Sequence, residues 1–247
     1  MAADISEFLN LLYSQVDRGI YVWGGNGENL SEMDKPREWI ARHEADAKDE
    51  KRAIALFDQR VADGVTDIRA FDCSGLVYWA LKTMGLQKTD LSSRGLYAAC
   101  EKIEKAELRP GDLVFHSDGK RIVHVGVYVG TNRYIEAKGR DVGVVCGERK
   151  PNYWTHFGRW KAFENDPMPE PTDDLVLVKG RSVNVRSVDH VPEDKKLKES
   201  TIIGVAHRKE TYRLIAIAPS GWYEIDFKGQ IGYISNRPDL TEVVTYA

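Results

Sequence analysis

The chain reads FDCSGLVYWALKTMG from residue 71 to residue 85. Leu76, Ala80 and Met84 recur at helical spacing, and Gly85 is the kind of residue that ends a helix. The pattern predicts a buried helix that opens at Cys73. First-turn N–H groups lack a partner within the helix and its dipole places about +0.5 charge there, so we expect a lowered pKa and a nucleophilic thiolate at Cys73. The alternative is a buried structural cysteine that packs as a small hydrophobic residue.

Composition places the chain among soluble globular proteins, because 42% of its 247 residues are hydrophobic and 30% are charged. The net charge is -3 and no basic stripe is visible, which argues against nucleic acid as the main partner. The three cysteines are far apart and form no CxxC pair, so neither a disulfide framework nor a zinc site is indicated. We therefore expect no metal and no organic cofactor.

The N-terminal residues show no pattern of export. Residues 1–9 lack a basic n-region, and no apolar run in the chain reaches the roughly 18 residues that a membrane span needs. We expect a chain that carries neither a signal peptide nor a membrane anchor of its own.

Two segments precede the cysteine helix. Apolar residues at helical spacing from Ile5 to Val16, with Gly19 as a stop, predict an amphipathic helix. Residues 26–70 are highly charged, and Pro36 and the spaced apolar residues after it predict one or two helices in an inserted arm. The arm either forms a lid or a wall of a substrate groove, or it is a solvated face with no role.

The chain turns to β-structure after the cysteine helix. A turn at 108–112 leads into a strand. Within 122–129, valines alternate with His124, Gly126 and Tyr128, so we expect His124 to point away from the valine face. Further strands are predicted at 133–137 and 142–146.

Residues 164–174 contain three prolines among acidic residues, which predicts an extended linker. Beyond it, short alternating runs separated by Gly, Asp, Asn and Lys predict a small β-barrel. We therefore expect an α+β chain with two domains, at 1–163 and 175–247. The runs in the second domain are 175–178, 182–186, 201–205, 211–217, 222–226 and 230–234.

A thiol nucleophile needs a base that takes its proton and a third group that orients the base. His124 and Glu136 are the candidates, because a hairpin that closes symmetrically about Gly130 sets them directly opposite on one face, where they would touch. The alternative is that both have only structural roles in their strands. The other histidines lie in charged or loop segments without such a partner: His43, His116, His156, His190 and His207.

Four motifs now stand in order along the chain: FDCSGLV at 71–77, LRPGDLVF at 108–115, HVGVYVG at 124–130 and YIEA at 134–137. Together they resemble the NlpC/P60 cysteine peptidases in order and spacing. Residues 21–25, YVWGG, look like the upstream Tyr-x-Trp-Gly-Gly element of that family. The resemblance covers about residues 5–160.

This resemblance implies a papain-like fold and hydrolysis of peptidoglycan stem peptides, typically between D-γ-glutamyl and a diamino acid. Cys73 would attack, His124 would act as base and then as acid, and Glu136 would be the third catalytic group. The Cys73 amide and Tyr21 would hold the oxyanion. By the same likeness four residues would line the substrate groove, with ordinary capping and loop roles as the alternative: Asp72, Ser74, Ser93 and Arg94.

The chain departs from the family pattern in three places. Glu136 stands where a histidine is usual, and a carboxylate favours the imidazolium more strongly than a neutral imidazole does. Leu96 stands where a glutamine is common. The segment 26–70 is far longer than the usual connection, so the bond that is cut stays open.

The C-terminal region resembles a bacterial SH3 (SH3b) domain in 183–187, 221–225 and 229–234. Such modules often bind cell wall. Three aromatic residues would stack on glycan or peptide if exposed, or else fill the barrel core: Trp222, Tyr223 and Tyr233.

The expected protein is therefore a peptidoglycan hydrolase of the thiol protease class, with peptidoglycan or muropeptides as its partner and a papain-like domain joined to an SH3-like barrel. Synthesis in a bacterial cytoplasm without a signal peptide suggests a phage-type endolysin that another factor releases to the cell wall. Delivery by a secretion machine and a cytoplasmic role in muropeptide recycling are alternatives. Other open readings are an N-acetylmuramoyl-L-alanine amidase, an acyltransferase, and a catalytically silent wall-binding protein.

Overall fold

The computed structural model describes residues 5–130, 132–163, 174–218, 220–228 and 230–245. The chain divides into two compact units, Met1–Asp166 and Pro167–Ala247. The predicted linker at 164–174 lies outside the described residues except for Asp174, which begins the first strand of the second unit. Within the described part of the chain, no helix is long and apolar enough to cross a membrane.

The first unit combines helices with two sheets. A six-stranded antiparallel sheet has the order β4-β9-β5-β6-β7-β8, and a three-stranded sheet has the order β1-β3-β2, with β1 parallel to β3. The strands are β1 Ile20–Tyr21, β2 Asn26–Asn29, β3 Arg69–Phe71, β4 Glu101–Lys102, β5 Leu113–Ser117, β6 Ile122–Gly130, β7 Arg133–Gly139, β8 Gly143–Gly147 and β9 His156–Arg159. The helices are α1 Ile5–Tyr13, α2 Pro36–His43, α3 Ala47–Ala62, α4 Cys73–Thr83 and α5 Ser93–Ala99, with short 3-10 turns at Leu30–Glu32, Lys105–Glu107 and Lys161–Phe163.

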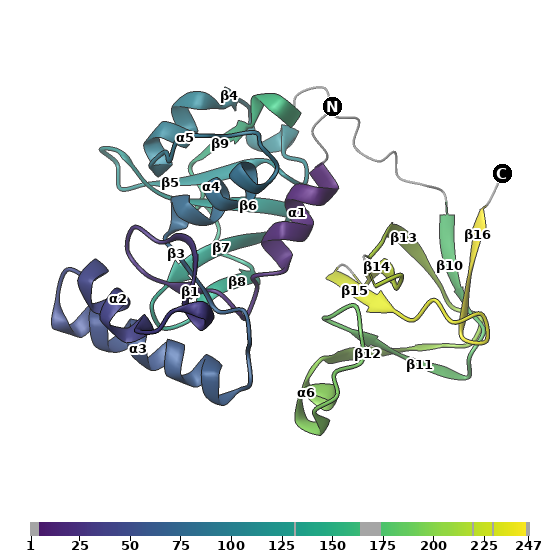
Figure 1. Ribbon diagram of the computed structural model, residues 1–247. Helices are drawn as coiled ribbons and strands as arrows, with labels where there is room; N and C mark the ends of the chain where they lie inside the picture. The colour runs from purple at the N-terminus through teal and green to yellow at the C-terminus, as the bar shows by residue number, and fades with distance from the viewer. Residues whose placement is uncertain (1–4, 131, 164–173, 219, 229, 246–247) are drawn as a thin grey trace. The chain divides into compact units, whose positions relative to one another are not determined.

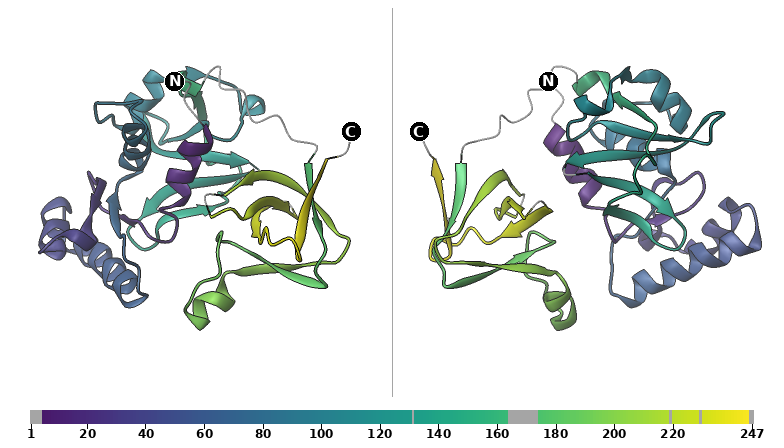
Figure 2. Two further views of the ribbon diagram at one scale, coloured as in Figure 1. Left: turned by 45° about the vertical axis from the view of Figure 1, so that its right-hand side comes forward. Right: turned by 180° about the vertical axis from the view of Figure 1, so that it is seen from behind.

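Helices α1, α4 and α5 cover one face of the six-stranded sheet (Figures 1 and 2). Val125, Val127 and Val129 of β6 are buried in the core between the helices and the sheet. Because successive strand residues point to opposite faces, His124 and Tyr128 lie on the other side of the sheet. The predicted division of β6 into a valine face and a histidine face is therefore confirmed.

The cysteine helix is confirmed with its predicted start and stop. Asp72 caps α4, since its Oδ1 accepts a hydrogen bond from the Gly75 N–H at 2.7 Å, and Gly85 follows with a φ of 73°. The first helix is shorter than predicted. It ends at Tyr13, and successive turns through Asp17, whose φ is 59°, lead to β1.

Residues 26–70 form the arm, and the predicted helices are α2 and α3 (Figure 1). The arm has a core of its own, in which Ile40 and Phe57 pack with Ile20 of β1 and with Ile68. It is therefore a packed part of the first unit and not only a solvated face. The core residues are Ile20, Val22, Leu30, Ile40, Ala53, Leu56, Phe57, Ile68 and Ala70.

Ion pairs fasten the arm to the turn between β7 and β8. Arg140 in that turn contacts Glu44 at 2.6 Å and Asp49 at 3.2 Å. Arg52 of α3 contacts Asp141 of the same turn at 2.6 Å. The arm and this turn therefore form one charged contact region.

The second unit is a seven-stranded antiparallel sheet with the order β12-β11-β15-β14-β13-β10-β16. All six predicted runs are strands, whereas helix α6 Lys195–Ser200 and strand β16 Thr241–Thr245 were not predicted. Among the described residues no ladder joins the end strands β12 and β16, so the predicted closed SH3-like barrel is not confirmed. The remaining strands are β10 Asp174–Val178, β11 Ser182–Arg186, β12 Ile202–His207, β13 Thr211–Ile217, β14 Tyr223–Phe227 and β15 Gln230–Ile234.

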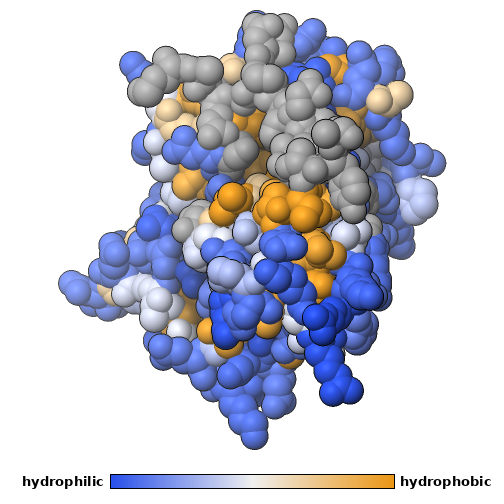
Figure 3. Space-filling view, turned by 90° about the vertical axis from the view of Figure 1, so that its right-hand side faces the viewer, coloured by the Kyte–Doolittle hydropathy of each residue, from blue (hydrophilic) through white to orange (hydrophobic). Residues whose placement is uncertain are grey.

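Apolar residues divide between the core and the surface of this sheet. Val185, Ile225 and Phe227 belong to its buried core. Ile217 on β13 is 64% exposed, and further aliphatic residues on β13 and β16 are also exposed. In the face shown in Figure 3, hydrophobic residues gather among hydrophilic ones.

Candidate active site

The Cys73 thiol lies where the first turn of α4 meets strand β6. Its side chain is buried, and the backbone N–H groups of Cys73, Ser74 and Val125 lie against the sulfur. Val125 directly follows His124 on β6. The fold therefore brings the predicted nucleophile against the backbone next to the predicted base.

The acidity of this thiol differs from the prediction. Burial raises the pKa of Cys73 to about 12, the Asp72 carboxylate raises it as well, and the three backbone N–H groups lower it. The helix N-terminus thus acts in the predicted direction, but the cost of placing a charge in a buried site is larger. The prediction of a lowered pKa is wrong for the folded chain. A thiolate at Cys73 needs a neighbouring base that accepts the proton and remains beside it as a cation.

Glycines allow the segment before the arm to press against α4. A Cβ on Gly75 would lie 1.8 Å from the carbonyl oxygen of Gly25, so no side chain fits there. The Gly24 N–H donates to Asp72 Oδ2 at 3.2 Å, and the Asp72 N–H donates to the Gly25 carbonyl at 2.9 Å. This close approach explains Gly75 and holds Tyr21 near Cys73.

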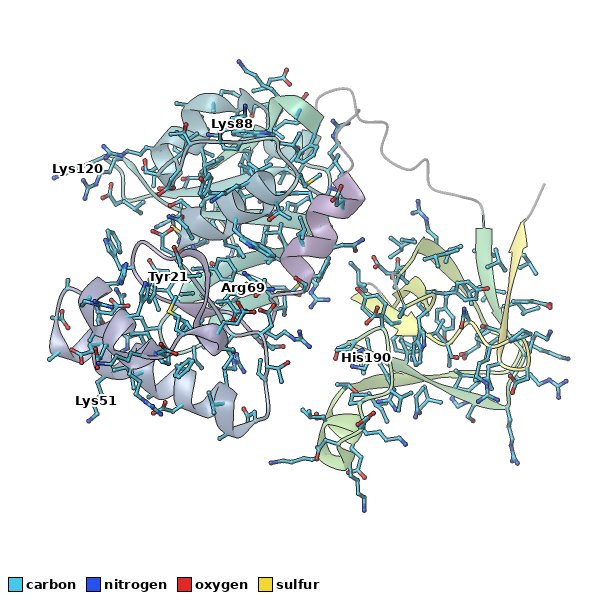
Figure 4. All side chains as sticks on the ribbon, viewed as in Figure 1. Tyr21, Lys51, Arg69, Lys88, Lys120 and His190 are labelled. Carbon is cyan, nitrogen blue, oxygen red and sulfur yellow. The ribbon has the colours of Figure 1, made fainter. Side chains whose placement is uncertain are left out.

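Tyr21, which is labelled in Figure 4, is the last residue of β1. It pairs with Phe71 of β3. Burial raises the pKa of the Tyr21 hydroxyl, and the proximity of Cys73 and Asp72 raises it further. The hydroxyl therefore stays protonated at neutral pH and is able to donate a hydrogen bond. The guanidinium of Arg140 lies over the Tyr21 ring at 5.1 Å.

His124 and Glu136 are in contact, since His124 Nε2 lies 2.7 Å from Glu136 Oε2. The predicted register is wrong, however. Val127 pairs with Ile135, and the register shifts between Tyr128 and Gly130. Continued along the strands, this pairing places Glu136 opposite Gly126, so His124 reaches Glu136 along the diagonal. The reason is that Gly130 pairs with Arg133, so the hairpin closes beyond Gly130 and not symmetrically about it; the one-residue bulge offsets only part of this displacement.

A glycine leaves room for Trp154 beside this contact. A Cβ on Gly126 would lie 2.9 Å from the indole ring of Trp154. The Trp154 ring instead stacks on His124, with 5.8 Å between ring centroids and 8° between the planes. His124 is therefore fixed by Glu136 at one ring nitrogen and by Trp154 on one ring face. Because the Glu136 carboxylate accepts from Nε2, Nδ1 is the nitrogen left to take a proton.

Arg149 is a site residue that the sequence patterns did not reveal. Its Nε donates to Glu136 Oε1 at 2.7 Å, and its second nitrogen donates to Glu136 Oε2. Burial raises the pKa of Glu136, but the hydrogen bonds from His124 and Arg149 outweigh burial and lower it overall. Glu136 is therefore ionised at neutral pH. Arg149 follows β8 in a segment with no motif, so nothing in the sequence pointed to it.

His116 and Tyr153 complete the surroundings of the pair. His116 of β5 lies directly opposite His124 of β6, and its ring stacks on Tyr153 at 4.2 Å between centroids. Tyr153 also approaches the His124 ring edge-on. His116 was set aside in the sequence analysis, yet the register brings it beside the site. In the described part of the chain, His43, His156, His190 and His207 contact none of Cys73, His124 and Glu136.

The four predicted groove residues have local roles in the structure. Asp72 caps α4 and also accepts from Ser74 Oγ at 2.9 Å, while Ser93 and Arg94 begin α5. No side-chain hydrogen bond or ion pair joins Ser93 or Arg94 to the other described site residues. The capping alternative therefore holds for Asp72 and Ser74, and the groove role of all four stays a prediction.

The described residues include no group of three or more His, Cys, Asp or Glu side chains that could hold a metal ion. In the second unit, Trp222, Tyr223 and Tyr233 are each half-buried, not exposed. Tyr223 packs against the core, and Tyr233 lies opposite Glu224, to which it is hydrogen-bonded. Their role as wall-binding residues stays a prediction.

Comparison with known proteins gives one family. The model of the NlpC/P60 family matches residues 18–159. The bifunctional muramidase/DL-endopeptidase CwlT of Bacillus subtilis (strain 168) is 38% identical over 98 residues, which cover 37% of this chain and 29% of that protein. The probable endopeptidase p60 of Listeria grayi is 36% identical over 91 residues, covering 36% of this chain and 18% of that protein. This chain thus spans less than a third of the length of these curated relatives.

Among solved structures, the P60 domain of antigen MAP1204 from M. avium subspecies paratuberculosis is 26% identical, with a TM-score of 0.42. The match covers 63% of this chain and 93% of that one.

Proposed function

Because the chain belongs to the NlpC/P60 family, we propose that it is a cysteine peptidase that cleaves amide bonds in the stem peptides of peptidoglycan. The observation that carries the proposal is the position of the Cys73 sulfur at the N-terminus of α4, against the N–H of Val125, the residue that follows His124; His124 in turn pairs with Glu136. The B. subtilis relative is named as a DL-endopeptidase, which supports the substrate class.

The reaction begins with proton transfer from the Cys73 thiol to Nδ1 of His124. Glu136 holds the opposite nitrogen and stabilises the imidazolium, so the buried thiolate gains a counter-charge. The sulfur attacks the carbonyl carbon, and the oxyanion accepts hydrogen bonds from the Cys73 N–H and the Tyr21 hydroxyl. His124 then donates its proton to the leaving amine. Water, activated by His124, hydrolyses the remaining thioester and regenerates the thiol.

Turbidity of purified sacculi tests this proposal. We expect the protein to clear them and Cys73→Ala to lose activity entirely. Cys146→Ala is the matched control, because Cys146 is a half-buried thiol of the same unit and its removal should leave clearing unchanged. Equal clearing by wild type and Cys73→Ala would refute the thiol mechanism.

The bond that is cut is a finer part of the proposal. We propose the amide between D-γ-glutamyl and a diamino acid. Mass spectrometry of the released fragments separates this bond from the amide between glycan and L-Ala, and a product carrying a transferred acyl group would indicate an acyltransferase. Peptide fragments whose N-terminal residue is L-Ala with a free amine would contradict the endopeptidase assignment.

A catalytically silent wall-binding protein is the second candidate, favoured by the raised pKa of Cys73. Iodoacetamide distinguishes the two, since it alkylates the thiolate. Rapid labelling of Cys73 near neutral pH, and its loss in His124→Ala, is expected for the peptidase. Labelling as slow as that of the buried Cys100, whose pKa burial likewise raises, would favour the silent protein.

For the second unit we propose cell-wall binding of the SH3b type. In the inactive Cys73→Ala background, Trp222→Ala should reduce co-sedimentation with sacculi. Val191→Ala is a control in the same unit at an exposed position and should bind normally. Equal binding by both variants would remove Trp222 from the proposed surface.

The role as a phage-type endolysin stays a prediction. Expression in a bacterial host together with a membrane-permeabilising factor should cause lysis, and expression alone should not. Lysis without that factor would contradict the prediction.

A further inference from the structure

The third member of the proposed catalytic group is not a lone carboxylate. The side chain of Glu136 is 2% exposed and accepts hydrogen bonds from both His124 and Arg149. Arg149 contributes both ends of its guanidinium fork, one to each carboxylate oxygen. Such two-point geometry fixes orientation as well as charge.

Aromatic rings hold Arg149 in place. Its guanidinium lies 4.3 Å from the centroid of the Tyr153 ring, a distance typical of a cation–π contact. Tyr153 stacks in turn on His116, and its carbonyl oxygen lies 2.7 Å from His116 Nδ1. The side chain of Arg149 is only 18% exposed. Arg149 is therefore held by both its carboxylate partner and an aromatic ring, unlike a surface arginine that contacts a single carboxylate.

The charges in the site differ strongly from those of a Cys-His pair with a bare carboxylate. An ionised Glu136 beside His124 stabilises the imidazolium, and the positive charge of Arg149 offsets that effect through the same carboxylate. The ion pair of Glu136 with Arg149 is nearly neutral as a unit. The titratable or charged groups around His124 and Glu136 are His116 at β5 and Arg149 and Tyr153 after β8. Cys73 at α4 lies near Tyr153, and Asp72 and Tyr21 lie near Cys73.

We propose that Arg149 is a positioning residue of the catalytic site, which orients Glu136 toward His124 and sets the pH range in which Cys73 and His124 exchange a proton. The inference rests on the proposed thiol chemistry. It accounts for a carboxylate at a position where the family usually has a neutral imidazole, because the ion pair supplies an oriented acceptor without a full negative charge.

The pH dependence of two rates tests the inference: alkylation of Cys73 by iodoacetamide, and clearing of sacculi. Removing a positive charge moves every titration in its surroundings to higher pH, and removing a negative charge does the reverse. Arg149→Met should move the midpoints of both profiles upward by about one pH unit. Glu136→Gln should move them downward, and the double variant should lie close to wild type.

Three further variants separate charge from structure. Arg149→Gln removes the charge and keeps an amide donor, so it should show the same upward shift. It replaces Arg149→Met in the test if that variant does not fold. Arg149→Lys keeps the charge and should leave the midpoints in place with a lower maximal rate. Arg159→Met is the matched control, because Arg159 forms a similarly buried two-point pair with Asp112 away from the site.

Midpoints that stay unchanged in both Arg149→Met and Arg149→Gln, as in Arg159→Met, would overturn the inference and leave Arg149 a structural residue. The alkylation readout keeps this outcome separate from the proposed function. If wild type does not clear sacculi but the alkylation profiles of the Arg149 variants shift as described, the proposal of peptidoglycan hydrolysis fails and the role of Arg149 stands.

Discussion

Glu44 provides a quantitative test of how the arm is attached. Its side chain is fully buried at 0% exposure and accepts two hydrogen bonds from Arg140, at 2.8 and 2.6 Å. Its other oxygen accepts from the Trp23 N–H at 3.3 Å. Glu44→Ala removes all of these contacts at once and leaves the largely buried Arg140 with Asp49 as its remaining ion-pair partner among the described residues.

The magnitude follows from the environment of Arg140. Breaking a buried ion pair by removing one partner costs about 3–5 kcal/mol. Because Asp49 stays 3.2 Å from Arg140 and the side chain of Arg140 is 15% exposed, we expect a smaller loss than this range, about 2–3 kcal/mol. For a unit of this size each kcal/mol corresponds to about 2–4 °C, so the Tm of the first unit should fall by roughly 5–10 °C.

Differential scanning calorimetry of the full chain measures this shift. Glu38→Ala is the matched control, since Glu38 lies on α2, the helix that Glu44 follows, and forms an exposed pair with Lys35, and exposed pairs contribute only about 0–1 kcal/mol. If Glu44→Ala lowers the Tm no more than Glu38→Ala does, Glu44 does not fasten the arm and the reasoning is refuted. The hydrolysis rate should also fall, because Arg140 lies over Tyr21.

Three other substitutions make separate predictions. Gly126→Ala places a methyl group 2.9 Å from the Trp154 ring; we expect a loss of about 1–3 kcal/mol in stability and a lower hydrolysis rate, and a variant with unchanged Tm and rate would contradict the stacking argument. Asp72→Asn keeps a capping oxygen but removes a charge that raises the pKa of Cys73, so the thiol should be alkylated faster at a fixed pH with little change in Tm; slower alkylation would contradict the sign. The pKa of Glu136 is lowered from 4.5, so its carboxylate stabilises the fold above that pH and this contribution is lost as the pH falls through the lowered value. Thermal melts should therefore show a larger loss of Tm upon acidification for wild type than for Glu136→Gln, and equal losses would exclude this linkage.

Local sequence signals predicted the elements that carry the proposed chemistry. The start of α4 at Cys73 and its end before Gly85 follow from capping and from the left-handed conformation of glycine. The two faces of β6 follow from alternation alone. These features depend on residues that are neighbours in sequence, so the pattern contains the information.

Features that depend on distant residues were not predictable in the same way. The shifted register of β6 and β7 arises because Gly130 pairs with Arg133 and the hairpin closes beyond Gly130, a position that no residue type required. Arg149 reaches Glu136 across 13 positions, and Glu44 reaches Arg140 across 96. An arginine in a loop pairs with whichever carboxylate the fold presents, so neither contact has a sequence signature.

The acidity of Cys73 was mispredicted for a related reason. The helix N-terminus is visible in the sequence, but the extent of burial is a property of the whole core. Strand β16 and helix α6 were missed in the second unit because their segments carry mixed polar and apolar residues without a clear alternation.

The ion pairs that attach the arm limit how the first unit can be rebuilt by module exchange. A chimera that replaces residues 26–70 with a short connection would leave Arg140 and Asp141 without their partners and would expose Ile20 and Val22 to solvent. A transplantable cassette must therefore include both the arm and the tip of the β7–β8 hairpin. Because the guanidinium of Arg140 lies over the Tyr21 ring, a substitution at the hairpin tip also affects Tyr21, which is far away along the chain.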